Sequence, residues 1–147
     1  MKMKKKSNLT SLVLVALVVL STSKLSGQDS PARKIARGKY LVEGVAGCAY
    51  CHTPRTDRGE PDRTRWLQGA TLDFQPIHPI PIWAPVAPPL AALPGWSEAD
   101  AIKLLETGIS RTGKPARPPM PPYRMTREDA AAVVAYLKSL QPAAKVR

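Results

Sequence analysis

The sequence contains little of the material from which small proteins build metal sites, disulfide frameworks or aromatic cores. It has only two cysteines, two histidines and one phenylalanine among 147 residues. A structural zinc site needs four ligands, so it would have to use every cysteine and histidine of the chain, Cys48, Cys51, His52 and the distant His78. A disulfide between Cys48 and Cys51 would close a very short loop and add little stability. No strand pattern or internal repeat stands out.

The chain also lacks an apolar run long enough for a comfortable membrane span, which takes roughly 20 residues. Residues 9–20 are nearly all apolar, follow Lys2, Lys4, Lys5 and Lys6, and precede small residues at 21–23 and 25–27. This pattern is typical of a secretory signal peptide. We therefore predict a signal at 1–27, with an uncleaved N-terminal anchor as the alternative, and one domain at 28–147. No cysteine lies near position 28, which disfavours a lipoprotein anchor.

The formal net charge of +11 overstates how basic the domain is. Residues 1–27 hold five of the 22 Lys and Arg and none of the 11 Asp and Glu, which leaves +6 for residues 28–147. No aromatic-rich basic surface or nucleic-acid motif accompanies this charge. We expect no nucleic-acid partner, and membrane association only if the N-terminal segment is retained.

The two cysteines and one histidine stand together in Cys48-Ala49-Tyr50-Cys51-His52. This Cys-x-x-Cys-His spacing is the attachment signature of a c-type haem. The two thiols add across the haem vinyl groups, and one helical turn places both sulfurs along one haem edge. His52 then lies under the iron as its proximal ligand. A thioredoxin-like redox pair would need a βαβ setting, which the sequence does not show. We predict one covalently attached haem c, held by Cys48, Cys51 and His52.

Composition agrees with this prediction. With one phenylalanine and 16 prolines, all after the signal, the domain has trouble building a core unaided. A haem supplies a large apolar body around which proline-rich loops can pack. We predict three helices, at about 31–43, 98–107 and 127–140. Their start and stop signals are Ser30 with Gly44, Ser97 with Gly108, and Thr126.

The iron's second axial ligand has three candidates: Met120, Met125 and His78. Met120 lies in Pro118-Pro119-Met120-Pro121-Pro122, where rigid chain on both sides would hold the thioether in place. Met125 precedes the cap Thr126, so a packing role suits it, and His78 lies in a loop beside Pro79. A Met/His pair also raises the reduction potential, as in electron-transfer cytochromes. We favour Met120.

The chain resembles the class I c-type cytochromes. It is most similar to the haem modules in the cytochrome subunits of bacterial periplasmic dehydrogenases for alcohols, aldehydes and sugar acids. The resemblance covers nearly all of residues 33–141. The segments that carry it are, in order, 38–41, 47–55, 67–70, 96–100, 107–108, 120–121, 128–130 and 135–140.

The resemblance implies an all-α, cytochrome c-like fold with about three main helices and proline-rich loops around one haem. It implies His52 and Met120 as axial ligands, and a crossing of the first and last helices at Gly38, near Tyr136. The chain has one attachment motif, whereas such subunits often have three. The partner protein of those subunits therefore cannot be assigned to this chain from the resemblance. Arg63, Arg65 and Trp66 have two interpretations, as propionate ligands or as part of a solvated loop.

We therefore predict an exported, periplasmic monohaem electron carrier, not itself an enzyme. Its partners would be redox proteins: a dehydrogenase, an oxidase or another cytochrome. The alternative is a haem protein with an open or labile sixth site, acting as a ligand-binding protein or an enzyme. A structural or docking subunit fixed to a membrane dehydrogenase is a second alternative.

Overall fold

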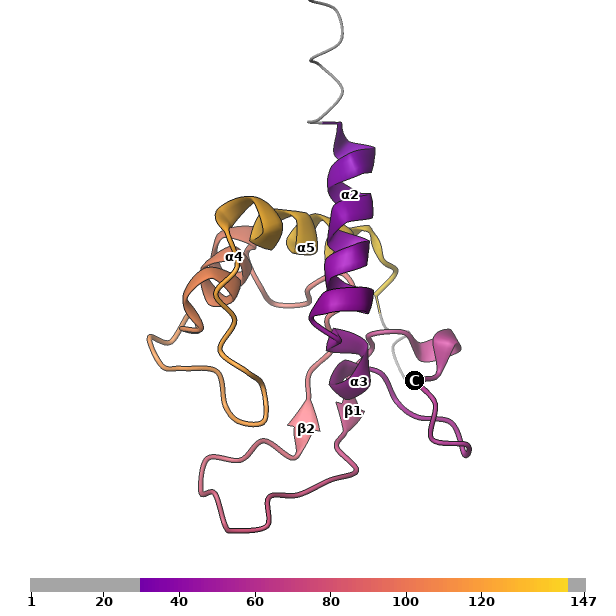
Figure 1. Ribbon diagram of the computed structural model, residues 1–147, viewed down its shortest axis with the longest axis vertical. Coiled ribbons are helices and arrows are strands. Elements are labelled where there is room, and N and C mark those ends of the chain that lie inside the picture. Colours follow the sequence, from indigo (N-terminus) through magenta and orange to yellow (C-terminus); the bar gives the residue numbers. More distant parts are fainter. Residues whose placement is uncertain (1–29, 143–147) are drawn as a thin grey trace, which may run out of the picture. The chain divides into compact units, whose positions relative to one another are not determined.

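The computed structural model describes residues 30–142 and is mostly helical (Figure 1). Within these residues, no helix combines the length and the apolar character needed to cross a bilayer. The predicted signal at 1–27 lies outside the described residues. In chain order the elements are helix α2 (Pro31–Tyr40), a π-helical turn (Leu41–Val45), helix α3 (Cys48–His52), a 3-10 turn (Arg63–Arg65), strands β1 (Ala70–Thr71) and β2 (Val86–Ala87), and helices α4 (Glu98–Thr107) and α5 (Arg127–Ser139).

Helices α2 and α5 cross with their backbones in close approach at Gly38 (Figure 1). A Cβ atom at Gly38 would lie 1.9 Å from the carbonyl oxygen of Ala132 and 2.8 Å from Cβ of Tyr136. Only glycine fits there. Arg37 donates two hydrogen bonds, of 2.9 and 3.1 Å, to the carboxylate of Asp129 on α5. The crossing that the resemblance implied is confirmed.

The two later helices begin and end where the local sequence predicts. The Ser97 hydroxyl accepts a 3.1 Å hydrogen bond from the amide of Asp100, and Gly108 ends α4 with φ 70°. The Thr126 hydroxyl accepts from the amide of Asp129, at 3.2 Å, and caps α5. The predicted ranges 98–107 and 127–140 are confirmed, the second to within one residue.

The first helix differs from the prediction of 31–43. Its α-helical part ends at Tyr40, and a π-helical turn continues the coil to Val45. The amide of Ala46 donates back five residues to the carbonyl of Leu41 at 2.7 Å. We expected Gly44 to end the helix, but it lies inside this wider turn. Glycine only weakens a helix, so the chain can continue through it as a helical turn. Leu41 and Val42 are both buried there.

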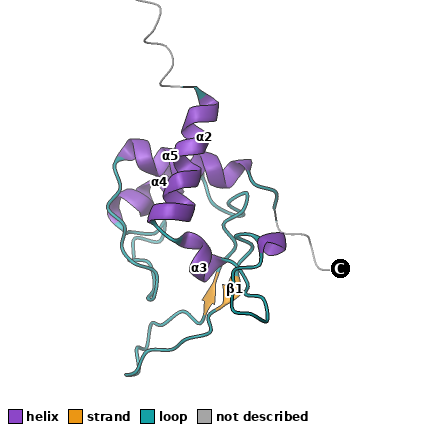
Figure 2. Ribbon diagram, turned by 45° about the vertical axis from the view of Figure 1, so that its right-hand side comes forward, coloured by secondary structure: helices purple, strands orange, loops and turns teal. Residues whose placement is uncertain are grey.

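A small two-stranded antiparallel ribbon was not predicted. Ala70 pairs with Ala87 and Thr71 with Val86, and strands of two residues are too short to leave an alternating pattern in the sequence. The ribbon and the long loops extend from the grouped helices (Figure 2). The all-α class is nevertheless confirmed, because helices form the core. The largest fully buried side chains are Val42, Thr53, Leu67, Val133 and Val134.

Candidate functional site

Both candidate attachment cysteines lie on the single turn of helix α3. Gly47 precedes this turn with φ 60°, the left-handed conformation that turns the chain out of the π-helical segment. Cys48 and Cys51 are half-buried free thiols. Burial raises the pKa of the Cys48 thiol to about 11. The structure thus presents two free thiols on one helical turn, as the spacing predicted.

His52 closes the same turn and is 7% exposed. Its Nδ1 lies 2.7 Å from the carbonyl oxygen of Pro88. Because a carbonyl oxygen only accepts, Nδ1 carries the proton and Nε2 keeps a free lone pair. Burial lowers the pKa of His52, and the hydrogen bond to Pro88 opposes this only in part. The ring is therefore held as the neutral tautomer that can bind a metal ion through Nε2.

Two further residues hold the Pro88 carbonyl in place. The hydroxyl of Thr53, which is 1% exposed, accepts a 3.0 Å hydrogen bond from the amide of Leu67. The carbonyl of Leu67 in turn accepts from the amides of Leu90 and Ala91, at 2.8 and 3.0 Å. These hydrogen bonds link Thr53, next to His52, through Leu67 to the segment that follows Pro88. Such outer contacts orient a ligating histidine.

The three candidates for the second axial position have different surroundings. Met125 packs against the hydrophobic core, and its amide donates to the carbonyl of Leu105 at 3.0 Å. His78 is exposed. Met120 is half-buried and does not belong to the core cluster. These positions fit the predicted packing role of Met125, while the assignment of Met120 as a ligand stays a prediction.

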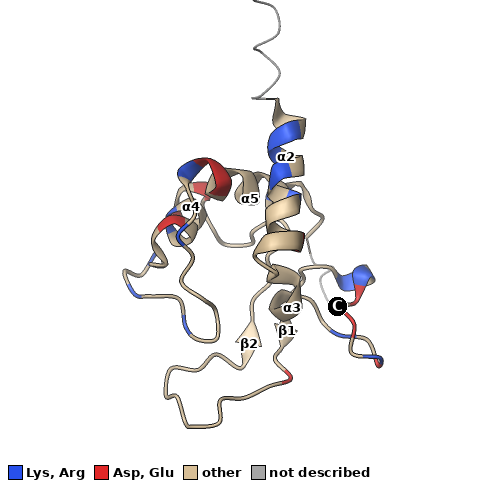
Figure 3. Cartoon of the chain, in the orientation of Figure 1, with Lys and Arg blue, Asp and Glu red and all other residues tan. Residues whose placement is uncertain are grey.

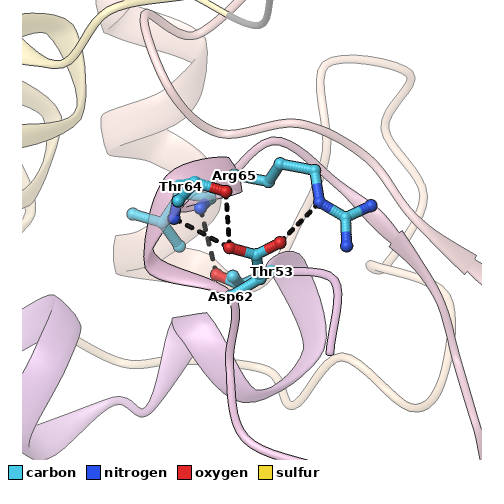
Figure 4. A network of polar contacts seen from close by, with 5 residues as sticks. Thr53, Asp62, Thr64 and Arg65 are labelled. Atoms are coloured by element: carbon cyan, nitrogen blue, oxygen red, sulfur yellow. Dashed lines mark hydrogen bonds and ion pairs between the residues drawn. The ribbon is translucent and has the colours of Figure 1, made fainter. Parts of the chain in front are cut away.

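Arg65 belongs to a polar turn centred on Asp62 (Figure 4). The Asp62 carboxylate accepts from the Thr64 amide at 2.8 Å, the Thr64 hydroxyl at 2.6 Å and Arg65 Nε at 2.7 Å. These donors lower the pKa of Asp62 to about 2, with the Thr64 side chain making the largest contribution. Arg65 thus has a carboxylate partner within its own turn.

Arg63 and Trp66 form a second cluster with Glu43 and Tyr136. The Arg63 guanidinium lies 4.0 Å from the centroid of the Trp66 ring and 3.9 Å from the Glu43 carboxylate. The hydroxyl of Tyr136 donates to that carboxylate at 2.6 Å. Although Trp66 and the Tyr136 hydroxyl interact electrostatically, no hydrogen bond of ordinary geometry joins them. The propionate role of Arg63, Arg65 and Trp66 stays a prediction.

The residues present fit a covalently bound haem. The thiols and the imidazole of α3 supply the attachment atoms and one axial nitrogen. In the described part of the chain, the indole N–H groups of Trp66 and Trp83 are buried without a hydrogen-bond partner. A buried donor of this kind costs free energy unless an acceptor meets it. Haem propionates are acceptors of the required type.

Charge is distributed unevenly along the chain (Figure 3). Lysine, arginine, aspartate and glutamate mark α2, α4, the start of α5 and the turn at 55–65. Residues 74–97 contain none of these four residue types. Apart from Asp73, two residues after β1, the long loop between β1 and β2 and the chain after it, up to α4, are therefore uncharged. Pro88 lies within this segment.

Several residues that shape the site were not predicted from the sequence. The Pro88 carbonyl carries no side-chain signature, and Thr53 reads as an ordinary loop threonine after the motif. Arg117 was also missed: it donates to the carbonyls of Ile82 and Trp83 at 3.0 and 2.6 Å. Its position three residues before Met120, in a proline-rich segment, is a signal that could have drawn attention to it.

Comparison with known proteins gives consistent matches. A family model described as cytochrome c matches residues 35–141. A "Diheme cytochrome c-type" protein of Cereibacter sphaeroides is 35% identical over 69% of this chain and 34% of its own length. The "Fructose dehydrogenase cytochrome subunit" of Gluconobacter japonicus is 29% identical over 71% of this chain and 21% of its own. The "Alcohol dehydrogenase (quinone), cytochrome c subunit" of Komagataeibacter europaeus is 34% identical over 74% and 25%.

The chain therefore spans about a third or less of the length of these relatives. The matched region of the family model contains Cys48, Cys51, His52 and Met120. It also contains the α2–α5 crossing at Gly38. The residues that the family model matches thus include the haem-attachment motif and the contacts that orient His52.

Proposed function

Since this chain belongs to the cytochrome c family, we propose that it is an exported monohaem c-type cytochrome that carries single electrons in a periplasmic or membrane-associated redox chain. Cys48 and Cys51 attach the haem, and His52 and Met120 bind its iron. Arg63, Arg65 and Trp66 are candidates for its propionates. The protein supplies ligands, burial and a docking surface rather than substrate chemistry.

One observation carries this proposal. A buried imidazole, fixed by Pro88 as the tautomer with a free Nε2, closes a helical turn that bears two free thiols. Haem iron supplies the redox chemistry by cycling between ferrous and ferric states. The task of the chain is to keep the ligand geometry the same in both states. Hydrogen bonds from Gly69 to the His52 carbonyl (2.8 Å) and from Leu67 to Thr53 (3.0 Å) serve this task.

The names of the relatives support a class of partner. The fructose and alcohol dehydrogenase proteins are named as cytochrome subunits, so a dehydrogenase is the first partner class to test, followed by an oxidase or another cytochrome. The predicted signal at 1–27 is consistent with the same setting, because c-type haem is joined to its protein outside the bacterial cytoplasm. Association with the membrane would follow if the segment 1–27 is retained.

The proposal is tested by counting and locating the haem. Purified protein should contain one haem per chain by pyridine haemochrome assay and intact mass, and acid acetone should leave that haem on the denatured polypeptide. Cys51→Ser should sharply lower the yield of holoprotein. Release of free haem into the solvent would overturn the attachment. A five-coordinate ferric spectrum with rapid carbon monoxide binding would instead support an open sixth site.

A further inference from the structure

Arg117 and Met120 are the first and last residues of one tight turn. The amide of Met120 donates a 3.1 Å hydrogen bond to the carbonyl of Arg117, and Pro118 and Pro119 lie between them. Proline restricts φ, so this turn moves as a unit. Whatever fixes Arg117 therefore also fixes the backbone of Met120.

The side chain of Arg117 fixes this turn to a distant part of the chain. Its Nε donates to the carbonyl of Ile82 at 3.0 Å, and a terminal nitrogen donates to the carbonyl of Trp83 at 2.6 Å. The amide of Ala84 returns a 2.8 Å hydrogen bond to the carbonyl of Pro118. Three hydrogen bonds thus join segments 82–84 and 117–118.

The loop that Arg117 holds is poor in donors of its own. Six of residues 76–89 are proline and have no backbone N–H, and no lysine or arginine lies in this range. The loop therefore has few backbone donors of its own, and the Arg117 guanidinium supplies two more. A guanidinium presents several N–H groups in a planar fork, which suits two consecutive carbonyls better than an ammonium group does.

The held loop leads directly to the proximal side of the site. After Ala84, the chain enters strand β2, which pairs with β1, and reaches Pro88, whose carbonyl accepts from His52. Arg117 is thus connected to Met120 through its own backbone and to His52 through segment 82–88. It joins the two loops that carry or orient both predicted axial ligands.

We propose that Arg117 is a positioning residue for the sixth iron ligand: it fastens the Met120 turn to loop 82–84 and opposes displacement of the thioether by external ligands. The inference rests on the proposed function, because it requires Met120 to bind the iron. It goes beyond that function by naming the contact that keeps the distal side closed.

The test compares Arg117→Ala and Arg117→Lys with the wild type and with Arg58→Ala. The last variant removes the same charge from an exposed loop position. The first measurement is hydrogen exchange of the Ala84 amide by NMR, which reports the loop contact without reference to the iron. The second is the rate at which cyanide binds the ferric protein, with the near-infrared sulfur-to-iron band recorded for each variant.

In Arg117→Ala, both the Ala84 exchange rate and the cyanide binding rate should rise about tenfold, which corresponds to ~1.4 kcal/mol for the two lost hydrogen bonds. Arg58→Ala should match the wild type, and Arg117→Lys should lie between. If Arg117→Ala matches Arg58→Ala while the wild type shows the band, the role of Arg117 is overturned and the proposed function stands. If Arg117→Lys equals the wild type while Arg117→Ala does not, a donor at position 117 still fastens the turn, and the proposal stands. If the wild type lacks the band, Met120 is not the ligand and both fail.

Discussion

Nδ1 of His52 donates a hydrogen bond to the carbonyl oxygen of Pro88 across 2.7 Å, although 36 positions separate the two residues in the chain. The acceptor is a backbone atom, so its place depends on the path of the loop and not on the proline side chain. That path is held by Leu67, whose amide donates to Thr53 and whose carbonyl accepts from Leu90 and Ala91.

Thr53→Val should therefore destabilise the protein. The substitution keeps the shape but leaves the buried amide of Leu67 without its 3.0 Å acceptor, at a cost of about 1–3 kcal/mol. Thr53→Ser retains the hydroxyl and should lose clearly less. Urea unfolding of the two holoproteins measures the difference. Equal stability of the two variants would show that the hydroxyl contributes nothing beyond its volume.

Gly38→Ala should disrupt the α2–α5 crossing. The new Cβ would lie 1.9 Å from the Ala132 carbonyl oxygen, so the helices must separate, at a cost of about 3 kcal/mol or more because a backbone atom cannot give way as a side chain can. Gly44→Ala is the matched control, since its Cβ would meet only the Tyr40 ring at 3.6 Å, an ordinary contact. In thermal unfolding, the midpoint temperature should fall strongly for Gly38→Ala and change little for Gly44→Ala.

The parts of the fold that the sequence predicts correctly are those fixed by neighbouring residues. Ser97, Gly108 and Thr126 act on backbone groups within four positions of themselves, so α4 and α5 could be located from local signals. The turn of α3 likewise follows from the attachment spacing. The π-helical turn at Leu41–Val45 could not be anticipated, because the same residues suit an ordinary helix.

The parts that the sequence does not predict depend on distant backbone atoms. Arg117 is bonded to carbonyls 35 and 34 positions away, and carbonyl oxygens are the same in every residue type. The sequence therefore identifies the chemical groups at the site and leaves open the contacts that orient them. Arg65 shows the converse: its side chain suits a propionate, yet a carboxylate three positions away already accepts from it.

The Asp62 turn predicts a specific pH dependence. Because the pKa of Asp62 falls from 3.8 to about 2 on folding, ionised Asp62 stabilises the native state above pH ~4, and this contribution is lost as the pH falls through ~2. The stability advantage of wild type over Asp62→Asn should accordingly shrink between pH 4 and 2. NMR titration of the carboxyl group gives the midpoint directly, and Thr64→Val should raise it. A midpoint near 3.8 in the wild type would show that the turn is not formed in solution.

The predicted signal at 1–27 lies outside the described residues and needs its own test. The apolar run at 9–20 is short, and small residues follow it, so we expect cleavage and a soluble periplasmic product. N-terminal sequencing or intact mass of protein from a bacterial host that matures c-type cytochromes decides the matter. Mature protein that keeps Lys2 to Lys6 and fractionates with membranes would establish a retained anchor.

The last prediction concerns the two methionines. A neutral thioether favours ferrous iron, and the prolines around Met120 restrict its loop before any iron–sulfur bond forms. Met120→Ala should therefore keep the haem attached through Cys48 and Cys51, lose the near-infrared sulfur-to-iron band, bind carbon monoxide readily and have a lower potential.

Met125→Ala is the natural control, because Met125 packs against the core and its amide is held by Leu105. It should retain the band and the potential and lose only stability, by up to about 2 kcal/mol, since truncating a partly buried methionine removes core contacts. Loss of the band in Met125→Ala but not in Met120→Ala would reverse the ligand assignment. A six-coordinate wild type that lacks the band from the start would point to His78, which His78→Ala then tests.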